Sequence, residues 1–293
     1  MTEYHIPVLA NEVLEYIGLE DGLTILDGTL GGGGHASLIL DKGHKLEYLG
    51  LDQDKDALAH VKTKLVDERL SFFHGSFFRA ADVLGEIKQV DRILLDLGVS
   101  SYQLDMAERG FSYMNDGPLD MRMNQNDDNA LTAKQILQDY DAERLADIFY
   151  NYGDERKSRI IAAEIIKRRE ESPLETTKQL VDLIHEIIYG NYQNKQSSVK
   201  RVFQSLRIEV NSELSALEQA LKDLWDLLAP GGRILVITFH SLEDRIVKNV
   251  FKTLRSEGDG LRLVKGSSVS PKWEEVQNNS RAKSARLRGI MKN

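Results

Sequence analysis

A glycine-rich stretch, residues 26–35 (LDGTLGGGGH), holds the side chains of this chain that are best suited to chemistry. Glycine is used where the backbone takes a positive φ or where another molecule approaches closely, and four in a row exceed the needs of a simple turn. The apolar run before the stretch predicts a strand, and the segment ASLIL after it predicts a helix. This order is typical of a nucleotide-binding α/β domain, so the loop is a predicted ligand site. A tight strand-to-helix turn without a ligand is the alternative.

An acidic residue, Asp52, ends the next predicted strand. It follows the loop by about 20 residues, the spacing at which an acid binds ribose hydroxyls in dinucleotide folds. The G-x-G-x-x-G spacing of pyrophosphate binders is not met cleanly, and Asp27 adds a negative charge at the start of the loop. These features favour a ligand that carries a ribose and a positive charge but no phosphate. S-adenosylmethionine has a sulfonium, an ammonium group and a ribose.

Two further candidates follow later strands of the predicted sheet. Phe77 comes after a strand over residues 70–74, where it could stack on an adenine or pack in the core. Residues 90–96 are apolar enough for a strand that is buried on both faces, and they end at Asp96. Because open α/β sheets bind ligands at the carboxyl ends of their strands, we expect both side chains near the glycine loop.

Helical periodicity replaces the alternation of strands and helices in the middle of the chain. Helices are predicted over residues 132–137, 141–150, 158–169 and 177–188. A long helix over 205–228 and a fifth strand over 233–239 then return to the sheet. We therefore predict a discontinuous sheet domain of residues 1–104 and 206–293, with an inserted loop and helical subdomain of residues 105–205.

Composition limits the classes of function. The chain has 293 residues, 41% of them apolar, which is enough for a large core. The absence of cysteine excludes disulfides and thiolate metal sites, and the histidines show no ligand spacing with acids, so no metal is predicted. No basic leader and no run of about 18 apolar residues occur, so we expect a cytoplasmic location and no membrane partner. The oligomeric state cannot be inferred from the sequence, which is compatible with a homodimer.

The net charge of −8 argues against indiscriminate binding of nucleic acid, so such binding requires local basic patches. One patch lies on the helix over residues 158–169, although nearby glutamates also fit a solvated, balanced face. Another lies in the tail over residues 280–293, which contains no acid and could contact RNA or form a surface-exposed terminal strand. The residues predicted to contact RNA are Arg109, Arg168, Arg169, Arg281, Lys283 and Arg286.

Several segments resemble one known family. They are the glycine loop and residues 96–101 (DLGVSS), 109–112 (RGFS), 116–123, 201–211 (RVFQSLRIEVN) and 239–248. From His5 to the tail the chain resembles the S-adenosylmethionine-dependent 16S ribosomal RNA (cytosine-N4) methyltransferases of bacteria, the RsmH or MraW family. The resemblance implies a class I methyltransferase fold, Rossmann-like with a mostly parallel seven-stranded sheet and an inserted all-helical subdomain. It also implies N4-methylation of a cytosine in the decoding region (P site) of 16S rRNA in the small ribosomal subunit.

The resemblance also assigns site residues. Those implied or predicted to bind S-adenosylmethionine are Asp27, Gly33, Gly34, His35, Asp52, Phe77, Asp96 and Gln103. Two departures from the family pattern are Tyr102, where proline is expected beside Gln103, and Lys283, where arginine is expected. Lysine keeps the charge but loses the bidentate geometry that arginine offers to phosphate.

Asp96 is the predicted catalytic residue. The N4 lone pair of cytosine is delocalised into the ring, so the enzyme must orient the amino group and accept its hydrogens. The Asp/Asn/Ser-Pro-Pro-Tyr/Phe motif of many amino methyltransferases is replaced here by DLGV, so position alone supports the assignment. Alternatives are an NAD-dependent dehydrogenase, which needs a different glycine spacing, and a non-catalytic ribosome-assembly factor. The acidic net charge favours the assembled subunit over naked RNA as substrate.

Overall fold

The computed structural model describes residues 7–127 and 129–293, and His5, where the resemblance begins, lies outside them. The chain divides into two compact units. The first comprises the chain up to Gly98 together with Leu214–Asn293, and the second comprises Val99–Glu213. The second unit extends a few residues beyond the predicted insertion, because helix α10 (Tyr192–Asn211) continues unbroken past residue 205. Among the described residues, no helix combines the length and apolar composition needed to span a bilayer.

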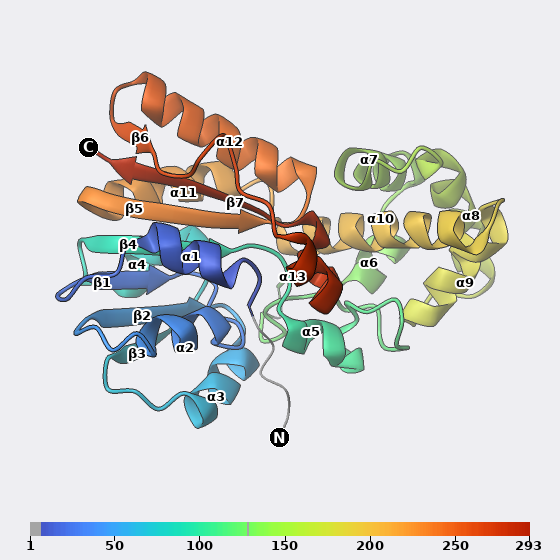
Figure 1. The fold of residues 1–293 in the computed structure, drawn as a ribbon. Helices are drawn as coiled ribbons and strands as arrows, with labels where there is room; N and C mark the ends of the chain where they lie inside the picture. Colours follow the sequence, from blue (N-terminus) through green and yellow to red (C-terminus); the bar gives the residue numbers. More distant parts are fainter. Residues whose placement is uncertain (1–6, 128) are drawn as a thin grey trace. The chain divides into compact units, whose positions relative to one another are not determined.

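A seven-stranded sheet forms the centre of the first unit (Figure 1). Its order is β3-β2-β1-β4-β5-β7-β6; β1 to β5 run parallel, whereas β7 is antiparallel to both β5 and β6. This confirms the predicted Rossmann-like, mostly parallel sheet. The strands are β1 (Thr24–Asp27), β2 (Glu47–Asp52), β3 (Leu70–His74), β4 (Val90–Asp96), β5 (Leu228–Thr238), β6 (Gly260–Arg262) and β7 (Arg286–Lys292). The strand order reverses direction between β1 and β4, the point at which open α/β sheets bind ligands.

Helices cover both faces of this sheet (Figure 1). Helices α1, α2 and α3 pack around Ile25 and Leu94, and helices α4, α11 and α12 pack around Leu26 and Leu95 on the other face. Neighbouring strand positions thus belong to different clusters, as the alternation of side chains requires. The helices are α1 (Ala10–Ile17), α2 (Gly34–Leu40), α3 (Lys55–Lys64), α4 (Ala80–Leu84), α11 (Leu217–Leu227), α12 (Ser241–Ser256) and α13 (Trp273–Asn278), with 3-10 turns η1 (Phe77–Arg79) and η3 (Ser280–Ser284).

The second unit is helical and has its own core. Side chains of Thr132, Asp141 and Thr176 cap the N-termini of α6, α7 and α9, which explains where these helices begin. All four helices predicted between residues 132 and 188 are confirmed. The elements are α5 (Ser101–Asp105), η2 (Ala107–Arg109), α6 (Ala133–Asp139), α7 (Ala142–Gly153), α8 (Ser158–Glu171), α9 (Thr177–Ile187) and α10.

Two expectations about the later part of the chain need correction. The single helix predicted over 205–228 is wrong, because α10 ends where Ser212 takes a left-handed conformation with φ 52°, and α11 starts at Leu217. The basic tail forms β7, which lies between β5 and β6 and so is an internal strand. Residues 287–290 of this strand, Arg288 included, are buried, which fits its internal place in the sheet.

Candidate active site

Three carboxylates lie at the carboxyl ends of neighbouring strands in the first unit. Asp27 ends β1, Asp52 ends β2 and Asp96 ends β4. Strand β1 lies between the other two, and its parallel register pairs Asp27 with Gly50 and with Leu94. Asp52 and Asp96 therefore extend two residues beyond Asp27, one on each side of it. The acids that the sequence singled out meet at the edge of the sheet where its order reverses.

Asp27 is almost completely buried, with 2% of its surface exposed. Its Oδ2 accepts a hydrogen bond from the Tyr48 hydroxyl at 2.8 Å, and its Oδ1 accepts one from the Thr29 amide at 3.1 Å. Burial raises the pKa of Asp27 to about 7, although both hydrogen bonds act in the opposite direction. Sequence reasoning missed Tyr48; the available signal was a tyrosine in a buried strand, because a buried hydroxyl needs a partner.

Asp52 connects the glycine loop to the start of α3. Its Oδ2 accepts a hydrogen bond from the Gly31 amide at 2.7 Å, and its Oδ1 accepts one from the Asp54 amide at 2.9 Å. Burial raises the pKa of Asp52 to about 6, against the lowering effect of these amides. Each carboxylate oxygen can accept a further hydrogen bond, so Asp52 can still accept from the hydroxyls of a ligand.

Glycine occurs at the positions of this loop for different structural reasons. A Cβ added at Gly28 would lie 2.6 Å from Cδ2 of Leu95, so a side chain there would displace the Leu95 side chain. Gly33 has φ +74°, and its added Cβ would lie 2.9 Å from Cγ1 of Val61 on α3. Gly34 begins α2. A Cβ added at Gly32 would meet no atom of the described residues within 4 Å, so they leave this part of the loop open to an approaching molecule.

Two buried polar atoms in this region have no hydrogen-bond partner among the described residues: Nε2 of His35 and Oδ1 of Asp96. His35 Nε2 lies 3.7 Å from the other carboxylate oxygen of Asp96, which is too long for a hydrogen bond. Burial lowers the pKa of His35 to about 4. Burial also raises the pKa of Asp96 to about 8, and the nearby carboxylates of Asp27 and Glu243 add to the shift. Buried polar atoms are normally paired, so these two indicate a ligand that supplies polar groups.

Phe77 begins η1 just beyond β3. Its ring centroid lies 4.3 Å from that of Phe78 at an interplanar angle of 50°, and it packs partly buried against the cluster around Leu26 and Leu95. Core packing is thus part of its role. Stacking on an adenine stays a prediction.

Comparison with known proteins decides the family. The model of the MraW methylase family matches residues 2–293. The chain belongs to this family. Three of its relatives are named ribosomal RNA small subunit methyltransferase H. The proteins of Clostridium botulinum (strain Loch Maree / Type A3) and Elusimicrobium minutum (strain Pei191) are 42% and 43% identical to this chain, and each alignment covers 97% of both chains. The protein of Carboxydothermus hydrogenoformans (strain ATCC BAA-161 / DSM 6008 / Z-2901) is 41% identical, over 98% of this chain and 97% of the relative. The protein is therefore a methyltransferase, as predicted.

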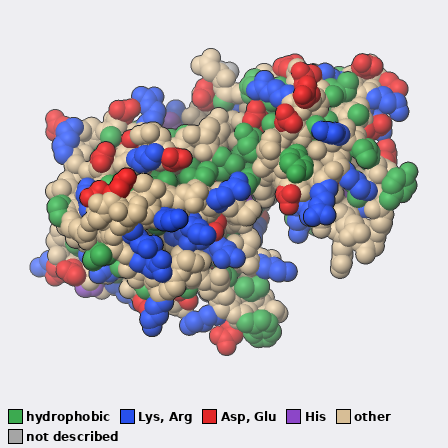
Figure 2. Space-filling view, turned by 90° about the horizontal axis from the view of Figure 1, so that it is seen from above, with side chains coloured by type: hydrophobic (Ala, Val, Ile, Leu, Met, Phe, Trp, Pro, Cys, Tyr) green, Lys and Arg blue, Asp and Glu red, His purple; other side chains and the backbone are tan. Residues whose placement is uncertain are grey.

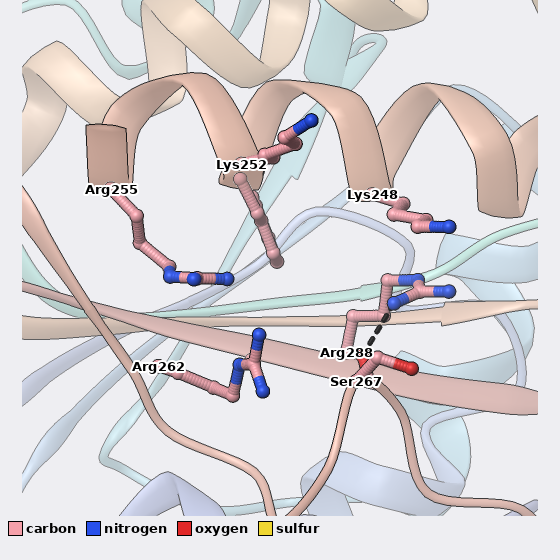
Figure 3. A pocket seen from close by; sticks show the side chains of 8 residues that line it. Lys248, Lys252, Arg255, Arg262, Ser267 and Arg288 are labelled. Carbon is pink, nitrogen blue, oxygen red and sulfur yellow. Dashed lines mark hydrogen bonds between the residues drawn. The ribbon is translucent and has the colours of Figure 1, made fainter. Parts of the chain in front are cut away.

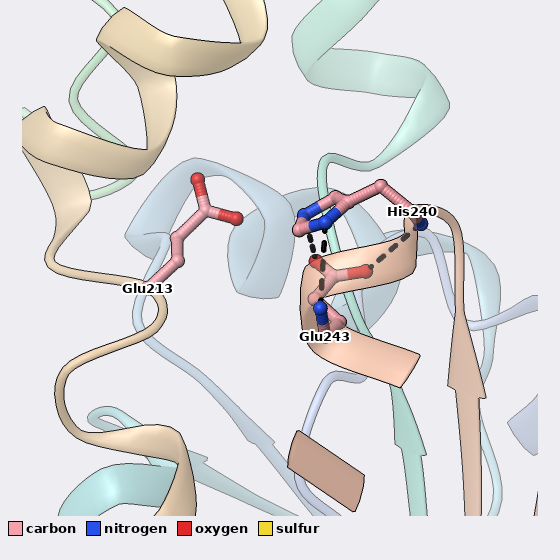
Figure 4. A group of neighbouring side chains, drawn as sticks. All are labelled: Glu213, His240 and Glu243. Atoms are coloured by element: carbon pink, nitrogen blue, oxygen red, sulfur yellow. Dashed lines mark hydrogen bonds and ion pairs between the residues drawn. The ribbon is translucent and has the colours of Figure 1, made fainter. Parts of the chain in front are cut away.

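In this methyltransferase a further polar pair follows β5, the strand beside β4. His240 caps α12: its Nδ1 accepts from the Glu243 amide, and the Glu243 carboxylate accepts from the amides of Phe239 and His240 (Figure 4). His240 Nε2 also lies 2.9 Å from Oε1 of Glu243. Sequence reasoning identified this loop but missed Glu243, whose buried carboxylate contributes to the raised pKa of Asp96. The capping-box spacing of His240 and Glu243 was the available signal.

Gln103 belongs to the second unit. It is the third residue of α5, where its side-chain oxygen accepts from the Ser100 amide at 3.0 Å and its own amide donates to Ser100 Oγ at 3.2 Å. The sequence suggested a cofactor contact, whereas the observed bonds form a capping box. Contact with the cofactor stays a prediction.

The basic residues predicted to contact RNA differ in accessibility. Arg109 is 3% exposed and donates to the carbonyls of Arg122 and Met123, so its role is internal to the loop and the RNA assignment needs correction. Arg169 likewise donates to two carbonyls at the end of α6. Arg168 is paired with Glu186 at 2.7 Å.

In the first unit, Arg281 is partly buried in η3, whereas Lys283 and Arg286 are exposed. The two exposed cations are the members of the predicted set that are most accessible to a phosphate. Their contact with RNA stays a prediction.

Proposed function

We propose that this methyltransferase transfers the methyl group of S-adenosylmethionine to N4 of a cytosine in the decoding region (P site) of 16S rRNA in the small ribosomal subunit. The names of its relatives support small-subunit ribosomal RNA as the substrate. The observation that carries the cofactor assignment is the set of three acids, Asp27, Asp52 and Asp96, whose pKa values burial raises to about 7, 6 and 8. A ligand with positive charge would stabilise the ionised form of these buried carboxylates, so such a ligand fits the site best.

The residues present fit S-adenosylmethionine. Asp52 has acceptor capacity for ribose hydroxyls, Gly32 leaves room for a ligand along the loop, and Phe77 has a partly exposed ring for the adenine. The unpaired atoms of His35 and Asp96 can receive polar groups of the ligand. When bound, the cofactor supplies an electrophilic methyl group on a sulfonium, and a carboxylate near that charge stabilises it.

Asp96 is proposed to orient the amino group of the base. As the N4–C bond forms and the S–C bond breaks, the nitrogen acquires positive charge and its hydrogens become more acidic. A carboxylate oxygen without another partner, Oδ1 of Asp96, can accept one of these hydrogens and later release the proton to water. Its pKa of about 8 makes it a better proton acceptor than an ordinary aspartate.

RNA binding is proposed to involve the second unit. Tyr189 is 86% exposed, with the Lys157 ammonium 6.0 Å from its ring centroid, and Tyr192 is 65% exposed. Exposed rings beside cations can stack on unpaired bases while the cations bind phosphates. The target base must leave its stack to reach a buried site, which favours recognition of RNA by shape. The net charge of −8 supports the assembled subunit as substrate, because its surface can supply contacts beyond bulk attraction.

The test is methyl transfer from labelled S-adenosylmethionine to small subunits isolated from cells that lack this protein, with the modified nucleoside identified by mass spectrometry. We expect N4-methylcytidine at one site, and loss of the product with Asp52→Ala. Asp56→Ala, an exposed aspartate four residues later, is the matched control and should retain activity. Protein-free 16S rRNA, assayed in parallel, should be the poorer substrate.

Each outcome of this experiment discriminates. A different methylated nucleoside would replace the cytosine-N4 assignment, and equal methylation of protein-free RNA would overturn the preference for the subunit. Subunit binding without methyl transfer would support the assembly-factor alternative.

A further inference from the structure

A pocket of about 180 Å³ in the first unit lies between α12, β6 and β7, and its lining is strongly basic. Lys248, Lys252 and Arg255 come from α12, and Arg262 comes from β6 (Figure 3). Figure 2 views this side of the first unit and shows Lys and Arg side chains gathered over it. This group could not be predicted from the sequence, because its members come from separate elements.

The positive charge of this pocket is not compensated internally. Arg288 on the pocket wall is neutralised by Asp244, with two hydrogen bonds of 2.8 Å, and it also donates to the Ser267 carbonyl. Lys248, Lys252 and Arg255, by contrast, form no ion pair or side-chain hydrogen bond with any described residue, and the same is true of Arg262. All four are exposed. Four unpaired cations therefore line one pocket in a chain of net charge −8, and Figure 3 shows Arg255 and Arg262 pointing toward each other while the Lys252 ammonium points away from Arg262.

The arrangement of these cations fits an extended anion. Lys248, Lys252 and Arg255 occur at i, i+4 and i+7, so they share one face of α12 over about 10 Å of helix. Arg262 extends into the same pocket from the strand opposite (Figure 3). Like charges brought together repel one another, and an anion between them removes the repulsion. Guanidinium groups are suited to phosphate because they can donate two parallel hydrogen bonds to it.

A purely structural role does not account for this group. Charged residues protect edge strands from pairing with other chains, and β6 is an edge strand, so Arg262 alone could serve that purpose. The three cations of α12 are not on the edge strand, yet they line the same pocket as Arg262. An edge-protecting role would not require that convergence.

We infer that this pocket binds the phosphodiester backbone of the RNA substrate, an inference that rests on the proposed function. Strands β5 and β7 separate β6 from β4, so Arg262 on β6 lies about 14 Å across the sheet from β4. Through Ile290 and Ile234 it is level with Ile93, three residues before Asp96, so the pocket is farther still from that carboxyl group. Contacts at that distance do not touch the reacting base. They hold the RNA in register while other residues carry out the chemistry.

The test compares two triple variants that each remove three charges. Lys248→Gln/Lys252→Gln/Arg255→Gln alters the pocket, and Lys42→Gln/Lys55→Gln/Lys64→Gln alters exposed lysines of the α2 and α3 region on the opposite face of the sheet. Binding to small subunits is measured without methyl transfer, at several salt concentrations. We expect the pocket variant to bind subunits at least tenfold more weakly, whereas the control changes little. The slope of the logarithm of the binding constant against the logarithm of the salt concentration should become shallower by about one for each lost phosphate contact.

Three further measurements complete the test. We expect the pocket variant to keep the wild-type affinity for S-adenosylmethionine and the wild-type kcat at saturating subunit, with only KM raised. The inference would be overturned if both triple variants bound small subunits equally weakly, or if the pocket variant had a lowered kcat with an unchanged KM. A third outcome would also overturn it. If the wild type and the pocket variant bound RNA equally well, but millimolar inorganic phosphate raised the thermal stability of the wild type alone, the pocket would bind a free anion and not RNA. If the wild type binds subunits but methylates none, the proposed function fails while the binding comparison still decides the role of the pocket.

Discussion

The imidazole of His35 and the carboxyl group of Asp96 are neighbours that do not form an ion pair. Nε2 of His35 lies 3.7 Å from Oδ2 of Asp96. Burial lowers the pKa of His35 to about 4 and raises that of Asp96 to about 8, so at pH 7 the imidazole is neutral and most of the carboxyl groups are protonated. The site without ligand is thus nearly uncharged at this position, and a bound cation would favour ionisation of Asp96.

Methyl transfer should depend on the ionisation of Asp96. Because only the carboxylate accepts a hydrogen from the base, we expect kcat/KM for S-adenosylmethionine to rise between pH 6 and pH 9, with a limb near the pKa of about 8. Asp96→Asn should lower the rate by roughly a hundredfold or more and remove this limb. The measurement is initial rate against pH at saturating small subunit.

The control for that profile is Asp82→Asn, which changes an aspartate of α4 whose side chain is 67% exposed. It should keep both the rate and the limb. If Asp96→Asn retained normal turnover with bound cofactor, Asp96 would not be the acceptor.

Asp96→Asn should also stabilise the fold at alkaline pH. The folded pKa of Asp96, about 8, exceeds the unfolded value of about 3.9, so folding favours the protonated form and stability falls as the pH rises through this interval. Asparagine cannot ionise, so Asp96→Asn should be more stable than the wild type by about 1–2 kcal/mol at pH 8, a fraction of the full linkage because 28% of the side chain is exposed. At pH 5 about a third of this difference should remain, because pH 5 still lies above the unfolded pKa.

Urea unfolding at both pH values measures this effect. A gain in stability that is the same at pH 5 and pH 8 would show that packing, rather than ionisation, is responsible. Loss of activity together with a gain in stability is the pattern expected of a residue kept for function.

Much of the candidate site could be predicted because its residues lie at the ends of strands. An apolar run followed by an acid identifies both a buried strand and its carboxyl end, which is how Asp27, Asp52 and Asp96 were found. Their clustering then follows from the parallel order of β1, β2 and β4. The glycine run could be recognised for the same local reason, because backbone requirements appear directly in the residue type.

Features that depend on contacts distant in sequence could not be predicted. Strand β6 has only three residues, and β7 looked like a basic tail, because pairing between them is decided by the sheet and not by local composition. The internal role of Arg109 depends on carbonyls 13 and 14 residues away. The pocket lined by α12 and β6 likewise exists only once the chain has folded.

The glycine loop should tolerate a methyl group at one position and not at the next. Gly33→Ala places an L-residue at φ +74° with its Cβ 2.9 Å from Val61, so we expect a loss of stability of about 1–2 kcal/mol or more and weaker binding of S-adenosylmethionine. Gly32→Ala meets no atom within 4 Å and should unfold like the wild type. Thermal unfolding with and without the cofactor measures both effects; equal destabilisation of the two variants would contradict the role assigned to the backbone conformation of Gly33.

The charge of the cofactor should make its binding depend on pH. S-adenosylmethionine carries a sulfonium that S-adenosylhomocysteine lacks, while the two share their ribose, adenine and ammonium groups. As the pH rises from 6 to 9, Asp27 and Asp96 ionise, since their pKa values are about 7 and about 8, so the site becomes more negative. We therefore expect the affinity for S-adenosylmethionine to rise relative to that for S-adenosylhomocysteine by roughly tenfold, corresponding to about 1.4 kcal/mol. Titration calorimetry of both ligands measures the ratio, which should respond less to pH in Asp96→Asn. A ratio that stays constant in the wild type would mean that neither carboxylate senses the sulfonium, and the ligand would then have to lie elsewhere along the loop.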